Sequence, residues 1–246
     1  MSDPIATAAE RIRRARHLTV LTGAGVSAAS GVPTFRGPDG LWRSFRAEDL
    51  ATPGAFRRDP RLVWEWYDWR RQRIAACEPN AAHDVLARWS QRFPDLTLVT
   101  QNVDGLHERA GTTRILRLHG SIWHVRCARP CSDGQTRRDD RVPLPEIPPP
   151  CICGEPLRPG VVWFGEMLPL DVVKQAGEAT ARCDVFVAIG TSALVYPAAG
   201  FIHEARAAGA TVIEINPETT GASDAVDLAV RQPAERALPE LDRLLQ

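Results

Sequence analysis

The chain has 246 residues with a formal net charge of +0, 44% hydrophobic residues and 24% charged residues. This balance excludes a disordered chain, and it excludes the strongly basic surface that would attract nucleic acid or an anionic membrane. A chain of this length buries one sizeable core and has room for a small second domain. It contains neither an apolar run near the ~20 residues of a membrane span nor an apolar signal-peptide core, so we expect a cytoplasmic protein.

Short apolar runs alternate with helical patterns through most of the chain. The runs that predict strands are residues 18–22, 96–100, 115–119, 161–164, 185–189 and 211–216. Helices are expected from Asp3-Pro4 onward and over residues 59–76, 80–93, 197–208 and 239–246. Nearly continuous apolar strands separated by helices predict an α/β fold, a Rossmann-like doubly wound parallel sheet covered on both faces.

The first predicted strand leads directly into a glycine-rich loop, Gly23–Gly25. Glycines at this position let a backbone turn tightly and approach a dinucleotide pyrophosphate, and Ala28 holds the third position of that fingerprint. A hydride-transferring dehydrogenase would continue through a long helix to a second strand ending in an acidic residue. Here the chain breaks at Gly31-Val32-Pro33 and continues with Phe35 and Arg36. The loop therefore predicts that NAD is bound and consumed, not used as a hydride carrier.

Polar side chains follow two of the later strands. Gln101, Asn102 and Asp104 come after the second strand, and His119 comes after the third. Because ligands of open α/β sheets bind beyond the carboxyl ends of the strands, these side chains are expected to face the same crevice as the glycine loop. Asn102 and Asp104 can bind a ribose or a carboxamide, and an Asx-turn before the next helix explains them equally well. His119 is a candidate general base, with a purely structural histidine as the alternative.

Four of the six cysteines form a cluster in the sequence. The pattern is Cys127-x3-Cys131 followed, after nineteen residues, by Cys151-x-Cys153. In a chain without an export signal, four thiolates predict a closed structural Zn²⁺ site, and unliganded or redox-active thiols are the alternative. Cys77 and Cys183 lie beside predicted elements and are expected to be buried structural thiols.

Two segments interrupt the alternation of strands and helices. Residues 35–77 contain a tryptophan-rich helical pattern, and residues 121–160 are rich in Pro and Arg, carry the four clustered cysteines and show little periodicity. We expect these segments to pack together as a smaller domain, part helical insertion and part zinc ribbon. Residues 1–34, 78–120 and 161–246 are then expected to form the Rossmann-like NAD-binding domain. Residues 143–150 contain five prolines, which predicts an extended loop.

Five motifs appear in order: GAGVSAASGVPTFRG, TQNVDGLHERAG, LHGS, the cysteine quartet and RPGVVWFGE. Together they resemble the sirtuins, a family of NAD-dependent protein-lysine deacylases, and the resemblance extends from about Arg16 to Leu241. It implies that an acyl group moves from a lysine of a protein or peptide to ADP-ribose. The implied products are free lysine, nicotinamide and O-acyl-ADP-ribose. The resemblance also implies one structural Zn²⁺, remote from the chemistry.

The resemblance assigns roles to individual residues of this sequence. The implied NAD-binding set is Gly23, Ala24, Gly25, Ala28, Thr34, Phe35, Arg36, Trp42, Gln101, Asn102, Val103, Asp104, Gly190, Thr191, Ser192, Asn216, Pro217, Glu218 and Ala234. Many sirtuins carry Asp where this chain has Thr34, so that position departs from the family pattern. His119 is implied as the general base, with Asn102 and Asp104 as further catalytic residues. The substrate peptide is implied to run past Val161, Val162, Phe164, Gly165 and Glu166.

Tyr67 and Arg70 form a Tyr-x-x-Arg pair in the tryptophan-rich helical pattern. Residues three apart share a helix face, and the plain alternative is a packed helix with Arg70 at the surface. In the class III branch of the family, the bacterial-type branch that this chain resembles, such a pair lies at the end of the acyl tunnel. The resemblance therefore implies succinyl, malonyl or glutaryl substrates as well as acetyl, because Arg and Tyr can bind a carboxylate.

Other classes of function remain open from the sequence. A mono-ADP-ribosyltransferase on the same fold would also consume NAD, and a non-enzymatic zinc-ribbon interaction module would keep the fold without the reaction. The missing acidic residue on a second strand opposes a dehydrogenase. Nothing in the sequence sets the oligomeric state, and a monomer is the simplest expectation.

Overall fold

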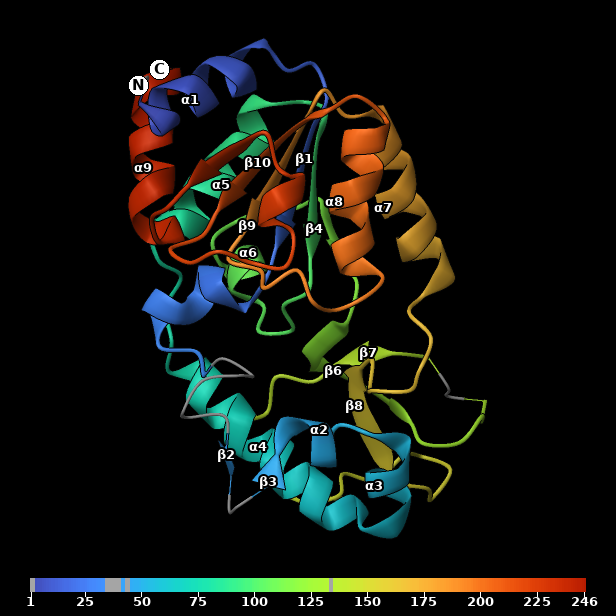
Figure 1. Ribbon diagram of the computed structural model, residues 1–246. Coiled ribbons are helices and arrows are strands. Elements are labelled where there is room, and N and C mark those ends of the chain that lie inside the picture. Colours follow the sequence, from blue (N-terminus) through green and yellow to red (C-terminus); the bar gives the residue numbers. More distant parts are fainter. Residues whose placement is uncertain (1–2, 34–40, 43–44, 133–134) are drawn as a thin grey trace.

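The computed structural model describes residues 3–33, 41–42, 45–132 and 135–246, and the larger part of the protein is built on a six-stranded parallel sheet (Figure 1). In spatial order the strands are β11 (Leu228–Val230), β10 (Thr211–Ile215), β9 (Val185–Ile189), β1 (Leu18–Thr22), β4 (Leu96–Thr100) and β5 (Ile115–Arg117). Counted in chain order, they lie in the order 3-2-1-4-5-6 from β5 to β11, which is the Rossmann arrangement. The predicted fold class is confirmed.

Strand β1 lies in the middle of this sheet and is buried along its whole length. It pairs in parallel with β4 on one side and with β9 on the other, so that Leu18 lies opposite both Leu96 and Val185. Strands covered by helices on both faces are nearly continuous in apolar residues, which is why their pattern is easy to read. The predicted bounds of β1, β4 and β9 are confirmed at every residue.

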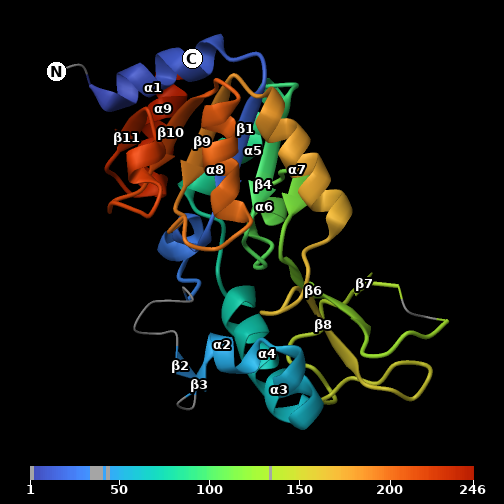
Figure 2. The ribbon, with the colours of Figure 1, turned by 45° about the vertical axis from the view of Figure 1, so that its right-hand side comes forward.

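Helices cover both faces of the sheet (Figure 2). One face packs on α1 (Pro4–Arg14), α5 (Ala81–Arg92) and α9 (Ala234–Leu245), the other on α7 (Leu170–Arg182) and α8 (Ala198–Ala207), and the short α6 (Leu106–Arg109) follows β4. The side chains of Asp3 and Asn80 cap α1 and α5 by accepting hydrogen bonds from Ile5 N and Ala82 N. The described ranges contain no helix long and apolar enough to cross a membrane.

Helix α9 begins earlier than the sequence predicts. The expected start lay at Pro239, whereas the helix starts at Ala234 and Pro239 lies inside it. Proline fits best in the first turn of a helix, which is why the sequence predicts a start at this residue, but in α9 the missing N–H of Pro239 is tolerated one turn later. Contacts with α5 fix α9: the buried carboxylate of Asp242 accepts from Trp89 Nε1 at 2.9 Å and from Arg88 Nη2 at 2.7 Å.

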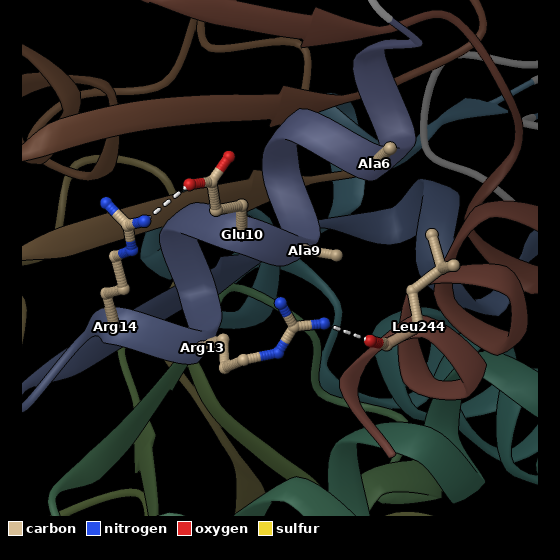
Figure 3. Close-up of a pocket in the computed structure, with 6 residues that line it drawn as sticks. All are labelled: Ala6, Ala9, Glu10, Arg13, Arg14 and Leu244. Carbon is tan, nitrogen blue, oxygen red and sulfur yellow. Dashed lines mark hydrogen bonds and ion pairs between the residues drawn. The ribbon is translucent and has the colours of Figure 1, made fainter.

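A pocket of about 490 Å³ lies between α1 and the end of α9 (Figure 3). Its charged side chains are already engaged, because Arg14 pairs with Glu10 at 2.7 Å and Arg13 donates to the carbonyl oxygen of Leu244. Helix α1 leads into β1, so this pocket lies at the amino ends of the strands, away from the carboxyl ends where α/β proteins bind ligands. We interpret the pocket as a structural contact between the two helices, in which Arg13 caps the last turn of α9.

A smaller layer lies beyond the carboxyl ends of the parallel strands (Figure 1). It comprises β2 (Leu41–Trp42), β3 (Phe45–Arg46), α2 (Ala47–Leu50), α3 (Pro53–Arg58), α4 (Pro60–Ala75) and an antiparallel sheet of β7 (Arg137–Arg138), β6 (Gly120–Cys127) and β8 (Leu157–Val161). One apolar cluster joins the helices to this sheet and includes Phe56, Trp64, Trp123 and Trp163. Both sequence segments that interrupt the alternation contribute to the cluster, and their boundaries as a domain stay a prediction.

Two expected strands differ from the observed ones. Residues 161–164 were expected in the parallel sheet, but the strand is β8, which ends at Val161 and pairs antiparallel with β6. The strand expected over residues 115–119 ends at Arg117, because the chain turns at Gly120. There φ is +73°, and a Cβ atom would lie 2.2 Å from the carbonyl oxygen of Gly160. This close crossing requires glycine and redirects the chain into the smaller layer.

Two smaller expectations are confirmed. Cys77 and Cys183 are buried thiols with exposed fractions of 9% and 5%. Residues 143–150 form a loop with several bends and without a regular helix or strand.

Candidate active site

The carboxyl ends of β1 and β9 define the crevice in which a Rossmann-type sheet binds its ligand. From β1 the chain continues to β4, and from β9 it continues to β10, so the two connections lead toward opposite edges of the sheet. The loops after them touch: a Cβ atom on Gly23 would lie 2.7 Å from the carbonyl oxygen of Gly190, and one on Gly25 would lie 2.8 Å from Gly190 Cα. Contact between the two loops therefore requires glycine at both positions.

The amides of these two glycines are already used within the protein. Gly23 N donates to the carbonyl oxygen of Ile189 at 3.0 Å, and Gly25 N donates to that of Gly190 at 2.8 Å. The chain then forms a 3-10 helix, η1 (Ala24–Ser30), which ends at Gly31 in the left-handed conformation. The glycines thus provide close approach of two loops, and hydrogen-bond donors to a phosphate have to come from other groups of the crevice.

Replacing Gly190 by alanine is expected to destabilise the protein by about 2–4 kcal/mol. Gly190 has a φ of +57°, and a Cβ atom there would lie 2.5 Å from Val26 N, so the loops after β1 and β9 would have to separate. Urea unfolding with and without NAD measures both the loss of stability and the loss of ligand stabilisation. The control is Gly177→Ala in α7, where a Cβ atom meets nothing within 4 Å. Equal stability of the two variants would contradict the tight loop contact.

A hydrogen-bonded network of polar side chains lies beside the glycine loop. Ser27 Oγ donates to Asp104 Oδ2 at 2.8 Å and accepts from Asn102 Nδ2 at 3.2 Å. Asn102 Nδ2 also reaches the carbonyl oxygen of Gly23 at 3.1 Å. The second oxygen of Asp104 accepts from Leu106 N at 2.9 Å, and burial raises the pKa of this carboxyl. With both oxygens engaged, Asp104 holds Ser27 and the start of α6 in place.

Two buried histidines extend this network, and sequence reasoning missed both. His83 Nδ1 accepts from Asn80 N at 3.2 Å, and its Nε2 lies 3.3 Å from Ser27 Oγ. His107 Nε2 lies 3.0 Å from Thr22 Oγ1, and the two imidazole centroids are 4.9 Å apart. Burial lowers the pKa of His83 to about 3 and that of His107 to about 4, so both are neutral near pH 7. The signal that could have revealed His83 is its place in the capping box that Asn80 begins.

His119 follows β5 and is held in one tautomer. Its Nδ1 lies 2.9 Å from the carbonyl oxygen of Gln101, which can only accept, so Nδ1 carries the proton and Nε2 carries the lone pair. Val162 N donates to the carbonyl oxygen of His119 at 3.0 Å, which fixes its backbone. Burial lowers the pKa of His119, and the hydrogen bond to Gln101 partly opposes this shift. A neutral imidazole with its lone pair on Nε2 suits a general base.

A second set of hydrogen-bonded polar side chains connects the carboxyl ends of β4, β9 and β10. Gln101 Nε2 donates to Thr191 Oγ1, and Asn216 Nδ2 donates to the carbonyl oxygen of Thr191, both at 2.9 Å. Sequence reasoning missed Glu214, a buried carboxylate in β10 that accepts from Ser223 Oγ at 2.7 Å and shapes the loop after the strand. The remaining predicted residues lie on the same strand-end loops or at the start of α9: Val103, Ser192, Pro217, Glu218 and Ala234.

Tyr67 and Arg70 lie one helical turn apart on α4. The phenol of Tyr67 is 2% exposed, and its oxygen accepts from Trp163 Nε1 at 2.9 Å. Arg70 is half-buried, and its guanidinium lies 5.1 Å from the ring centroid of Trp66. Burial lowers the pKa of Arg70, and the nearby carboxylate of Asp104 partly opposes this shift. The arginine is thus partly withdrawn from solvent, unlike an ordinary surface arginine.

The segment between β8 and α7 was predicted to line the substrate. Val161 is buried, Val162 and Glu166 are half-buried, and Phe164 and Gly165 are exposed. The carboxylate of Glu166 accepts from Arg158 Nη2 at 2.8 Å and from Trp163 N at 2.9 Å, so it ties the segment to β8. Within the described chain, no backbone acceptor faces the N–H of Gly165. This amide is therefore available to an extended peptide.

The four clustered cysteines come together in space. All four sulfur atoms lie within 4.8 Å of one another, with Cys127 Sγ 3.6 Å from Cys153 Sγ and Cys131 Sγ 3.8 Å from Cys151 Sγ. Four sulfurs at about 2.3 Å from a tetrahedral Zn²⁺ lie about 3.8 Å apart, whereas a disulfide requires about 2.05 Å. The cluster therefore fits a structural Zn²⁺ with no open coordination position, despite the irregular spacing in the sequence.

Four predicted cofactor residues cannot be placed in the site. Thr34, Phe35 and Arg36 lie outside the described residues, and for Trp42 only the backbone in β2 is described. Their roles stay predictions.

The fold and the site define a Rossmann-type nucleotide-binding protein whose second layer carries a four-cysteine metal site. The Sir2 family description matches residues 23–197. The chain is 52% identical over 226 residues to a protein of Aquifex aeolicus described as an NAD-dependent protein deacylase, covering 92% of this chain and 93% of that protein. It is 48% identical over 245 residues to a protein of the same description from Ralstonia nicotianae, covering 98% of each.

Solved structures agree with these relatives. The crystal structure of a Sir2 homolog–NAD complex matches with a TM-score of 0.90 at 45% identity, covering 97% of this chain and 93% of that one. The chain therefore belongs to the Sir2 family, and the resemblance to sirtuins is confirmed.

Proposed function

We propose that this protein is an NAD-dependent protein-lysine deacylase that acts on acidic acyl groups, succinyl and malonyl, as well as on acetyl. The observation that carries the deacylase reaction is His119, a neutral imidazole that follows β5 and whose Nδ1–H is bonded to the carbonyl oxygen of Gln101, which leaves the lone pair on Nε2. The relatives in Aquifex aeolicus and Ralstonia nicotianae are both described as NAD-dependent protein deacylases, which supports this reaction over ADP-ribosyl transfer to protein.

The crevice suits NAD as the co-substrate. The two glycine loops meet without side chains between them, and carboxamides of Gln101 and Asn102 lie at the strand ends beside them. We assign the pyrophosphate to the loop Gly23–Gly25, the nicotinamide ribose to the residues after β4, and the adenosine to the loops that begin at Gly190 and Asn216. NAD supplies the ADP-ribosyl group to which the acyl group is transferred. The residues of this chain bind NAD, orient it and transfer protons.

We assign the role of general base to His119. Its Nε2 accepts a proton from a hydroxyl group, and the positive charge that forms is stabilised because Nδ1–H remains bonded to the carbonyl oxygen of Gln101. Asp104 and Ser27 take no proton in this scheme, since each is already hydrogen-bonded to partners within the protein. They hold the loop after β4 at a fixed distance from the glycine loop. Asn102 bridges the two loops through its carboxamide.

The acyl preference rests on Tyr67 and Arg70. A half-buried guanidinium next to a buried phenol provides two donors in a largely apolar environment that includes Trp66. Such a site favours a group that brings a carboxylate over one that ends in a methyl, because charged hydrogen bonds gain strength away from water. Succinyl and malonyl groups carry that carboxylate, whereas an acetyl group does not.

Replacing Arg70 by methionine is expected to lower the ratio of desuccinylation to deacetylation, each measured as kcat/KM, by about 10–150-fold. Methionine keeps an unbranched apolar chain, so the acetyl reaction should change little. The measurement compares succinyl- and acetyl-lysine forms of one peptide, with nicotinamide and O-acyl-ADP-ribose identified by mass spectrometry. Arg73→Met is the matched control, since Arg73 lies one turn later on α4 and is exposed. An unchanged ratio in Arg70→Met would refute the acyl preference.

A further inference from the structure

The phenol of Tyr67 carries a hydrogen that nothing in the described protein accepts. Its oxygen lies 2.9 Å from Trp163 Nε1, and an indole N–H can only donate, so Tyr67 is the acceptor in this bond. The ring is 2% exposed, and burial raises the pKa of Tyr67 to about 12, so the hydroxyl stays protonated. Among the described residues, no side chain or backbone group takes the hydroxyl proton. A buried donor without an acceptor is unfavourable unless a ligand completes the site.

The indole that donates to Tyr67 is itself held by a guanidinium over its ring. Trp163 is 3% exposed, and the guanidinium of Arg158 lies only 3.5 Å from its ring centroid. Glu166 accepts from Arg158 Nη2 at 2.8 Å and from Trp163 N at 2.9 Å. The stack of Glu166, Arg158 and Trp163 therefore fixes the direction of the indole N–H before any substrate arrives.

We propose that Trp163 is a positioning residue for acyl-group specificity: its indole N–H occupies the acceptor side of the Tyr67 hydroxyl, so that the hydroxyl proton points at the carboxylate of an acidic acyl group. This inference rests on the proposed preference for succinyl and malonyl groups. Without the indole N–H, the Tyr67 hydroxyl is free to rotate and can present its oxygen to the carboxylate instead of its proton. The guanidinium of Arg70 would then bind the carboxylate without a well-oriented second donor.

The plain alternative is that Trp163 only fills the core of the smaller layer, where its ring centroid lies 5.2 Å from that of Phe56. The chain offers a matched control in Trp64. That residue is fully buried in the same cluster, and its Nε1 donates to the carbonyl oxygen of Leu157 at 2.7 Å. Its ring centroid lies 6.4 Å from that of Tyr67, but its N–H does not bond the hydroxyl. Trp64→Phe and Trp163→Phe therefore remove the same groups from one core and differ in their effect on Tyr67.

The experiment measures kcat/KM for succinyl- and acetyl-lysine forms of one peptide in wild type, Trp163→Phe, Trp64→Phe, Tyr67→Phe and the Tyr67→Phe/Trp163→Phe double variant. Trp163→Phe is expected to lower the succinyl-to-acetyl ratio by about tenfold, through a higher KM for the succinyl peptide. Tyr67→Phe should have a similar effect, and the double variant should fall no further than Tyr67→Phe alone. Trp64→Phe should leave the ratio within about twofold of wild type.

Each other outcome overturns the inference in a recognisable way. If Tyr67→Phe lowers the ratio and Trp163→Phe does not, or if Trp64→Phe lowers it equally, then Trp163 has no positioning role while the acyl preference stands. If wild type does not favour the succinyl peptide, the proposed preference and this inference fall together. Should Trp163→Phe not fold, Trp163→His keeps a ring N–H and is expected to retain the ratio within about threefold. A ratio in that variant as low as in Tyr67→Phe overturns the inference.

Discussion

Alanine in place of His119 is expected to lower the rate of deacylation by about 10²–10⁴-fold while NAD still binds. The variant removes the Nε2 lone pair that we propose accepts the proton, but it leaves the glycine loops and the carboxamides after β4 in place. Peptide deacylation under saturating NAD measures the first effect. Calorimetric titration with NAD measures the second.

The lowered pKa of His119 sets the expected acid limb of the pH profile of kcat/KM. Because burial lowers the pKa of His119, the imidazole stays neutral to a pH below its ordinary value of about 6.5. The base is competent only when neutral, so kcat/KM is expected to fall as the pH drops through an inflection below about 6.5. An inflection above neutrality would contradict the assignment, because it would require a raised pKa.

A control separates loss of the base from loss of a histidine in general. His203 lies exposed on α8, so His203→Ala is expected to retain wild-type activity and the wild-type acid limb. If His119→Ala kept near-full activity, proton acceptance would have to be moved to another group. The buried pair His83 and His107 is a poor substitute, since its neighbours are Ser27 and Thr22 and burial lowers the pKa of His83 to about 3 and that of His107 to about 4, which makes both rings weak bases.

The parallel sheet could be predicted from the sequence because its central strands are buried on both faces. β1, β4 and β9 are nearly continuous apolar runs followed by glycines or polar residues, so their bounds and the crevice follow from one pattern. β6 gave no such pattern, since half-buried residues interrupt its buried ones and it lies in a segment rich in Pro and Arg. Its pairing with β8 joins residues as far apart in the sequence as Gly120 and Val161, which local periodicity does not record.

The candidate site likewise contains residues that the sequence identifies and residues that only the fold brings together. Residues that follow strands directly, such as His119 and Asn102, could be found because the position itself is informative. Ser27, Trp163 and Glu214 act through partners distant in the sequence: Ser27 meets Asp104, and Trp163 meets Tyr67 96 residues away. Such pairs form only when the chain folds, so no spacing rule could have revealed them. For this reason the structure, and not the sequence, identifies the side chains that orient the candidate reactive groups.

Removing the metal is expected to unfold the smaller layer and abolish activity, although the cysteines take no part in the chemistry. Four thiolates leave no coordination position for a reacting water, so a Zn²⁺ bound here is structural. Structural zinc in small domains contributes about 10–16 kcal/mol, which is comparable to the whole stability of a typical domain. Cys127 and Cys151 belong to the apolar cluster that also holds Tyr67 and Trp163, so loss of the metal should also disorder the residues to which we assign acyl binding.

Cys127→Ser and treatment with a chelator should therefore give the same result. We expect zinc content measured by mass spectrometry, the near-ultraviolet signal of the buried tryptophans and deacylase activity to fall together. The far-ultraviolet signal of the parallel sheet should largely persist, because the two apolar clusters that cover its faces include none of the four cysteines. Cys183→Ala is the control: it removes a buried thiol from one of those clusters and should keep one zinc per chain. Full activity in a metal-free protein would show that the sulfur cluster holds the smaller layer together without zinc.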